Sequence, residues 1–318
     1  MDKNKPTVVV SRCLGFDKCR YNGDMIPNKF VKKLGEYVNY ITVCPEVEIG
    51  LPIPRETIRL VKDGEEIKLY QPSTGRELTE EMTNFTKEFL DSLEDIDGFI
   101  LKGRSPSCGT KDVKIYVGKE KAVGSFKGAG LFGKAVTVRY PNKAVEEEGR
   151  ITNFKIREHF LTKLFTNFTF KQVKASSSMA SLVKFQSDNK YLLMAYNQKE
   201  QKVLGRIVSN HEKKSFKELI KEYEEHLALT FARAPRYTSI INAFQHIIGY
   251  FSEKITSKER QFFLETLETY RDNKIPQSVL IHLLKSYAIQ FNEEYILQQT
   301  ILSPYPEGLI DLRDSGNE

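Results

Sequence analysis

The chain has 318 residues, of which 40% are hydrophobic and 28% charged, and its formal net charge is +6. This composition is typical of a folded globular protein with room for two domains, and it excludes a disordered chain. No stretch approaches the 18 consecutive apolar residues of a membrane span, and the apolar run at Val8–Val10 is too short for the core of a signal peptide. We therefore expect a cytoplasmic protein without membrane contact.

The first half of the sequence alternates short apolar strands with helical segments. Runs at 7–11, 40–43 and 98–101 are apolar on both faces, which is typical of central strands covered by helices on each side. Further elements are expected as a hairpin from Ile58 to Leu69 that turns at Asp63-Gly64, a helix from Thr79 to about Leu93, and strands at Val113–Val117 and Ala135–Val138. The pattern predicts an α/β fold with a doubly wound, mostly parallel, Rossmann-like sheet.

The second half changes to helical periodicity throughout. Helices are predicted at 153–168, 216–233, 237–255, 256–272 and 276–291. The acidic run Glu146–Glu148 marks the expected boundary between an α/β domain at 1–148 and an all-helical domain at 149–318. Most of the net charge, +5, falls in the second segment. A solvated basic surface is the ordinary interpretation, and contact with RNA through the helical domain is the alternative.

All four cysteines lie in the first 108 residues, and three of them follow predicted strands. Cys13 follows the first strand, Cys44 ends the second, and Cys108 follows the third through a short Gly- and Ser-containing segment. Open α/β sheets place their sites at the carboxyl ends of strands, so these cysteines are expected to converge. Cys19 lies in the segment after Cys13.

Several kinds of thiol chemistry remain open at this point. The absence of a second closely spaced cysteine pair, and of any histidine before His159, disfavours a zinc site. Thiolate-rich sites suit iron–sulfur clusters. A thiol-redox or cysteine-nucleophile enzyme, or cysteines that are only buried, are the alternatives.

Three motifs, in order, resemble the signatures of the bacterial thiouracil desulfidase family. They are the segment from Ser11 to Gly23, the pair Val43–Glu46 and Gly50–Arg55, and the segment Leu101–Gly109. Together they cover about the first 145 residues. Members of this family are often fused to an uncharacterised helical domain, and the second half resembles that domain at 243–251 and 302–306.

The helical half departs from its family pattern at three positions. Gln186, Asn189 and Tyr196 stand where the resemblance leads us to expect histidines. If those histidines bind metal or catalyse in relatives, this chain has lost that role. His246 remains, and a single histidine on a helix is more often structural.

The resemblance implies a 4Fe–4S cluster held by Cys13, Cys44 and Cys108, with one iron open to the sulfur of a thiolated nucleobase or nucleoside. Cys19 is then not a ligand. Glu46, two residues after a ligand, is the candidate proton-transfer group, and Ser105 is the second candidate catalytic residue. The candidate substrate-binding residues are Ser107, Lys102 and Arg55.

The resemblance therefore implies a desulfidase that hydrolyses a C–S bond without net redox change and releases sulfide. Two other functions remain open. One is an iron–sulfur protein that handles sulfur without C–S chemistry, and the other is a nucleic-acid-associated module in which the cluster is structural. The natural substrate, the role of the helical half and the oligomeric state are not predicted.

Overall fold

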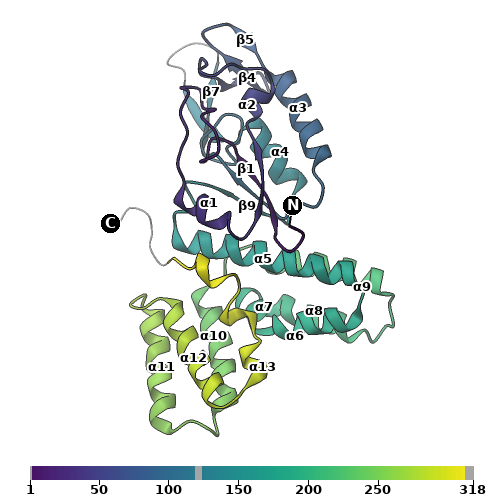
Figure 1. Cartoon of the computed structure of the whole chain (residues 1–318), viewed down its shortest axis with the longest axis vertical. Coiled ribbons are helices and arrows are strands. Elements are labelled where there is room, and N and C mark those ends of the chain that lie inside the picture. The colour runs from purple at the N-terminus through teal and green to yellow at the C-terminus, as the bar shows by residue number, and fades with distance from the viewer. Residues whose placement is uncertain (1, 119–123, 312–318) are drawn as a thin grey trace. The chain divides into compact units, whose positions relative to one another are not determined.

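The computed structural model describes residues 2–118 and 124–311 and divides the chain into two compact units. The first unit extends to Phe160 and contains all the strands described; the second begins at Leu161 and is helical (Figure 1). The expected fold class, an α/β region followed by an all-α region, is confirmed. The predicted domain boundary after residue 148 stays a prediction.

The first unit is built on a parallel four-stranded sheet in the order β2-β1-β6-β9. Its strands are β1 (Thr7–Ser11), β2 (Asn39–Val43), β6 (Gly98–Leu101) and β9 (Ala144–Glu147). The chain moves from β1 to β2 on one side and later adds β6 and β9 on the other. The order therefore reverses between β1 and β6, and such a switch point is where open α/β sheets bind ligands.

Four helices accompany this sheet: α1 (Lys29–Leu34), α2 (Pro45–Glu48), α3 (Thr79–Ser92) and α4 (Leu131–Arg139). One buried cluster joins Leu90 of α3 and Phe132 of α4 to Val9 and Phe99 of the sheet. Alternate residues of the central strands, such as Val8 and Ile100, are also fully buried. Burial of both faces explains why these strands are apolar throughout.

A second, mixed sheet has the order β5-β4-β3-β7-β8. Its strands are β3 (Arg59–Asp63), β4 (Glu66–Gln71), β5 (Arg76–Glu77), β7 (Val113–Val117) and β8 (Ser125–Gly128). The expected hairpin is present as β3 and β4, and the strand at Val113–Val117 is confirmed.

One predicted strand is wrong. Ala135–Val138 lies within helix α4, because the preceding glycines let a helix pack against the backbone of the segment that carries Cys108. A Cβ atom on Gly130 would lie 2.4 Å from the Ser107 carbonyl oxygen, and one on Gly133 would lie 2.4 Å from that of Gly109. This tertiary contact outweighs the β-branched character of the sequence.

The second unit consists of helices around one large apolar core. They are α5 (Phe154–Ser176), which begins in the first unit, then α6 (Met179–Asp188), α7 (Lys190–Tyr196), α8 (Gln198–Ser209), α9 (Phe216–Thr230), α10 (Tyr237–Ile248), α11 (Ser257–Arg271), α12 (Gln277–Gln290) and α13 (Glu294–Leu297), with 3₁₀ turns at Gly249–Phe251, Thr300–Leu302 and Glu307–Leu309. The capping box of Thr256 with Glu259 is present at the start of α11. None of the helices described is long and apolar enough to cross a membrane.

Candidate functional site

The three predicted ligand cysteines stand at the carboxyl ends of neighbouring strands. Strand β1 lies between β2 and β6 and is parallel to both. Cys13 comes two residues after β1, and Cys44 follows β2 directly and is the N-cap residue of α2. Cys108 follows β6 through the segment 102–107. Because the strands run in the same direction, three residues far apart in the sequence reach one edge of the sheet.

These cysteines and Cys19 are all buried and line one cavity of about 340 Å³. Its other walls include Glu46, Arg55, Lys102, Ser105 and Ser107. The structure thus brings every predicted site residue together around the same space. The volume lies within the range of cavities that hold small organic molecules. The individual roles of these residues stay predictions.

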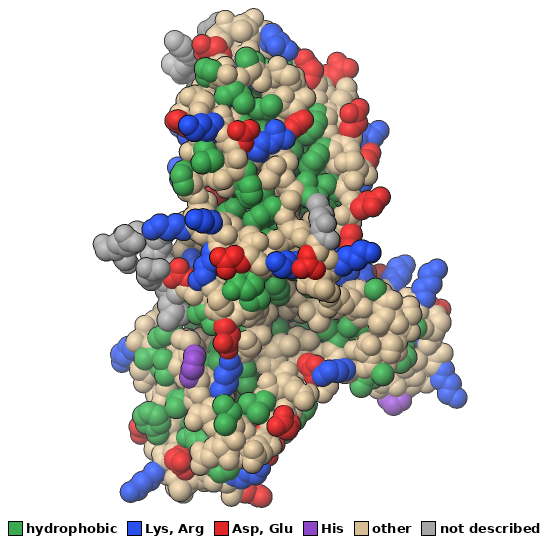
Figure 2. Space-filling view, viewed as in Figure 1, with side chains coloured by type: hydrophobic (Ala, Val, Ile, Leu, Met, Phe, Trp, Pro, Cys, Tyr) green, Lys and Arg blue, Asp and Glu red, His purple; other side chains and the backbone are tan. Residues whose placement is uncertain are grey.

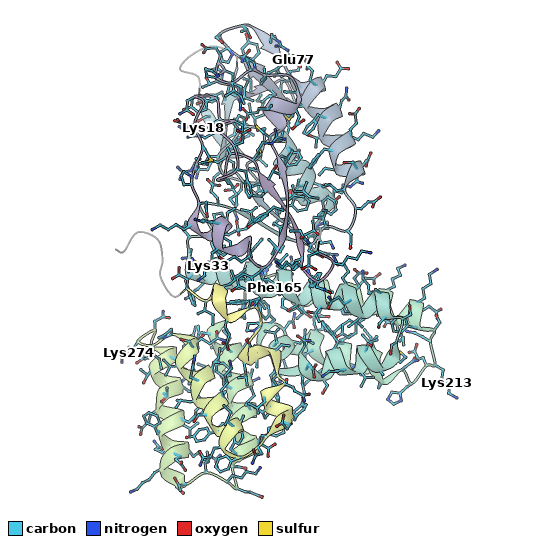
Figure 3. The ribbon with its side chains drawn as sticks, in the orientation of Figure 1. Lys18, Lys33, Glu77, Phe165, Lys213 and Lys274 are labelled. Carbon is cyan, nitrogen blue, oxygen red and sulfur yellow. The ribbon has the colours of Figure 1, made fainter. Side chains whose placement is uncertain are left out.

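Cys19 lies directly among the predicted ligands. Its thiol is hydrogen-bonded to the thiols of both Cys13 and Cys44, and its side chain is fully buried. The residue before it, Lys18, is exposed and is labelled in Figure 3. The hydrogen bond to Cys13 is the main reason why the pKa of Cys19 is raised to about 11.

The thiols of Cys44 and Cys108 also have raised pKa values. The pKa of Cys44 is raised first by the hydrogen bond between its thiol and Cys19 and then by burial, while the hydrogen bond from the backbone N–H of Val47 lowers it in part. Burial raises the pKa of Cys108 to about 12, and hydrogen bonds from Ser11 and Ser107 lower it in part. Donors that favour thiolate are therefore already present beside two sulfurs that are otherwise desolvated.

Glu46 stands at the centre of a polar network in the cavity wall. Its Oε1 accepts a hydrogen bond from Ser107 Oγ at 2.7 Å and a longer one from Ser105 Oγ at 3.4 Å. The two serine hydroxyls are 2.9 Å apart. Oε2 is bound by Arg55 through Nε at 2.9 Å and Nη2 at 2.6 Å. Both carboxylate oxygens are thus held, and the serine side of the group faces the segment that carries Cys108.

Two acidic residues at the end of β9, the strand beside β6, hold the Cys108 segment in place. Glu147 accepts hydrogen bonds from the backbone and side chain of Thr110, at 2.6 Å and 2.9 Å, and from Lys111 N at 3.1 Å. Glu148 accepts from Gly103 N at 2.6 Å and from Lys102 Nζ at 2.5 Å. The run that marked a domain boundary in the sequence therefore also has a structural role at the site.

Sequence reasoning missed Ser11 as part of the site. This last residue of β1 is 1% exposed, its Oγ accepts from Lys102 N at 2.9 Å, and its hydroxyl hydrogen-bonds the Cys108 thiol. A polar residue that ends a run of buried valines was the available signal, because a buried hydroxyl needs partners.

The thiol donors at this cavity are of the chemical kind that iron–sulfur clusters take. Within 2–118 and 124–311, no three His, Cys, Asp or Glu side chains are close enough to hold one metal ion. A single zinc ion requires all its thiolates at about 2.3 Å from one centre. A four-iron cluster instead takes each cysteine on a different iron, so its ligands stand farther apart. The structure supplies buried thiols from three strand ends around one cavity.

Comparison with known proteins agrees with this arrangement. The family model described as 2-thiouracil desulfurase matches residues 8–148. The uncharacterised protein YbbK of Bacillus subtilis (strain 168) is 30% identical over 138 residues, which are 41% of this chain and 85% of YbbK. The chain belongs to the 2-thiouracil desulfurase family.

The chain is also similar to a second curated protein and to a solved structure, and its helical half matches a second family model. The uncharacterised protein YbgA of Escherichia coli (strain K12) is 24% identical over 137 residues, 43% of this chain and 80% of YbgA. A solved structure described as the [4Fe-4S]-dependent thiouracil desulfidase TudS is 30% identical and covers 46% of this chain and 93% of its own, with a TM-score of 0.38. Residues 190–306 match a second family model, a protein of unknown function (DUF1722).

In the helical unit, the three positions where histidines were expected serve the packing. Gln186 Oε1 accepts a hydrogen bond of 2.6 Å from the hydroxyl of the buried Tyr223. Asn189 Oδ1 accepts a hydrogen bond from Thr300 Oγ1 at 2.7 Å, and the ring centroids of Tyr196 and Phe231 are 4.5 Å apart. These contacts give each position a structural use.

Proposed function

We propose that the first unit binds a 4Fe–4S cluster through Cys13, Cys44 and Cys108 and removes sulfur from a thiolated nucleobase or nucleoside. Membership of the 2-thiouracil desulfurase family supports the reaction class. The single observation that carries the proposal is the cavity that three strand-end cysteines share with Glu46, Ser105 and Ser107. When bound there, the cluster supplies iron as a Lewis acid for the substrate sulfur.

The chain's own residues account for the proton transfers of the reaction. Hydrolysis converts a C=S group and one water into a C=O group and H₂S, so water must lose protons while the sulfur gains them. Glu46 takes up the two protons of the attacking water in turn through its Oε1 side and returns each to the departing sulfur, and Ser107 and Ser105 give the protons a path of hydroxyl groups. Positioned acid–base groups of this kind contribute about 10²- to 10⁴-fold in rate.

Two further residues orient the substrate in this proposal. Ser107 presents a hydroxyl to the cavity, and Lys102 lies at its wall with its ammonium bound by Glu148 and by the carbonyl of Gly103. An ammonium held in this way forms a fixed positive edge for a polar substituent of the substrate. Arg55, which was also predicted to bind substrate, lies in the same cavity wall.

Sulfide release tests the proposal. The full chain is reconstituted anaerobically with iron and sulfide, and its absorbance at about 400 nm reports the cluster. With 2-thiouracil or 4-thiouridine, the loaded protein is expected to release sulfide, and Glu46→Gln is expected to lower that rate about 10²-fold or more while it keeps its iron. Glu48→Gln is the matched control, because Glu48 lies on the same short helix and pairs with Arg12 instead.

The outcomes separate this proposal from its rivals. A cluster-loaded protein that releases no sulfide from thiolated bases or nucleosides contradicts the desulfidase and favours sulfur handling without C–S chemistry. The RNA-associated alternative has less support. Of the described side chains on the face shown in Figure 2, Lys and Arg are interspersed with Asp and Glu over the helical unit.

A further inference from the structure

Arg55 is buried against Glu46 in the wall of the cavity. Its side chain is 3% exposed and that of Glu46 is 13% exposed. Two of its N–H groups, on Nε and Nη2, point at the same carboxylate oxygen, Glu46 Oε2. Charge-assisted hydrogen bonds from a guanidinium hold that carboxylate oxygen firmly in position.

The opposite end of the guanidinium is anchored to the backbone. Nη1 donates to the carbonyl oxygen of Cys19 at 3.0 Å and to that of Pro52 at 3.4 Å. A guanidinium has five N–H donors, and these contacts with the two to Glu46 occupy four of them. Little donor capacity is left for a substrate.

The geometry thereby gives the two oxygens of Glu46 separate tasks. Oε2 is held by Arg55, so the side chain cannot rotate to exchange its oxygens without breaking two ionic hydrogen bonds. Oε1 is left for Ser107 and Ser105, beside Cys108. We propose that Arg55 is a positioning residue that holds Glu46 Oε1 at the serine pair. This inference rests on the proposed catalytic function of Glu46.

The test uses Arg55→Met and Arg55→Lys in the reconstituted full chain, with 2-thiouracil as substrate and uracil as the product ligand. Arg55→Met is expected to lower kcat about 10²-fold, because an error of about 1 Å in a reacting group costs that much. Its KM and its Kd for uracil are expected to stay within about twofold of the wild-type values, since the contacts that bind substrate and product are unchanged. Arg55→Lys restores part of kcat, because an ammonium can meet one oxygen.

Two controls separate positioning from a general loss of structure. Arg139→Met removes a guanidinium of the same unit that pairs with the exposed Asp91, and it is expected to leave kcat unchanged. In the Glu46→Gln background, Arg55→Met is expected to lower kcat no further, because the group it positions is already lost. Iron content and thermal midpoint are measured for every variant.

Three outcomes overturn the inference. A rise in KM and in the uracil Kd with unchanged kcat assigns Arg55 to substrate binding. If Arg55→Met lowers kcat by the same factor in the Glu46→Gln background as in the wild type, Arg55 acts on a group other than Glu46. The third is independent of activity: a crystal structure of Arg55→Met in which Glu46 Oε1 keeps its hydrogen bond to Ser107. That structure decides the inference even if the wild-type protein releases no sulfide, which would contradict only the proposed function.

Discussion

The Cys108 thiol combines deep burial with two hydroxyl donors. Burial alone favours the protonated thiol, and the hydrogen bonds from Ser11 and Ser107 act in the opposite direction. Since the ligand of a metal centre is the thiolate, these hydroxyls stabilise the form that binds. Ser107 also donates to Glu46, whereas Ser11 also accepts from Lys102 N, so Ser11 is the donor that can be removed without a direct change at Glu46.

Ser11→Ala is expected to weaken the hold on the cluster. A hydrogen bond to a charged group contributes about 1.5–3 kcal/mol, so loss of the cluster to a chelator should accelerate at least about tenfold. The measurement is the decay of the absorbance at about 400 nm in excess EDTA under anaerobic conditions. Thr83→Ala, an exposed hydroxyl on α3, serves as the control. An unchanged decay rate in Ser11→Ala would show that this hydroxyl does not act on the Cys108 sulfur.

At the scale of the elements, helix α4 packs closely against the segment that carries Cys108. Gly130 and Gly133 bring its first turn against the carbonyls of 107–109. The same segment is held from another direction by Glu147 of β9. Two elements that carry no candidate ligand therefore determine where Cys108 lies.

Gly133→Ala is expected to displace the segment that carries Cys108. The added Cβ would lie 2.4 Å from the Gly109 carbonyl oxygen and 2.5 Å from that of Cys108, and both are backbone atoms that cannot rotate away. Overpacking of this kind costs about 1–3 kcal/mol of unfolding free energy. Urea denaturation and iron content after reconstitution measure the effect. Gly124→Ala is the matched control, because no atom that the structure describes lies within 4 Å of its added Cβ. Equal behaviour of the two variants would contradict the role of α4.

Helix α4 also shows where sequence reasoning stops. The strands at 7–11 and 98–101 were predictable because burial on both faces makes their sequences apolar, and the convergence of Cys13, Cys44 and Cys108 followed from those strand ends. Ala135–Val138 has the same β-branched character, yet contact with the 107–109 backbone makes it helical. The pairing of Arg55 with Glu46 was equally hidden, because Arg55 lies nine positions after Glu46, beyond the end of α2, and the sequence does not give their relative orientation.

At the scale of the whole molecule, the candidate site and the large helical core belong to different units. Every residue that lines the cavity lies between Ser11 and Cys108. The second unit holds its own buried polar contacts, such as that of Tyr223 with Gln186. The three positions where histidines were expected are occupied by residues that pack, so the proposed chemistry does not draw on them.

Tyr223→Phe is therefore expected to destabilise the second unit alone. Removal of the hydroxyl leaves the buried Gln186 oxygen without its 2.6 Å donor, which costs about 1–3 kcal/mol. The midpoint of the urea transition that reports the helical unit should fall, while iron content and sulfide release stay at the wild-type values. A loss of iron in this variant would contradict the assignment of the site to the first unit.

The most direct test of the central claim is the iron content of the four single Cys→Ser variants after anaerobic reconstitution of the full chain. The account predicts about four iron atoms per chain for the wild type and for Cys19→Ser. It predicts a large loss of iron for Cys13→Ser, Cys44→Ser and Cys108→Ser. Loss of iron from Cys19→Ser, or its full retention in any of the other three, would contradict a cluster held by those three cysteines.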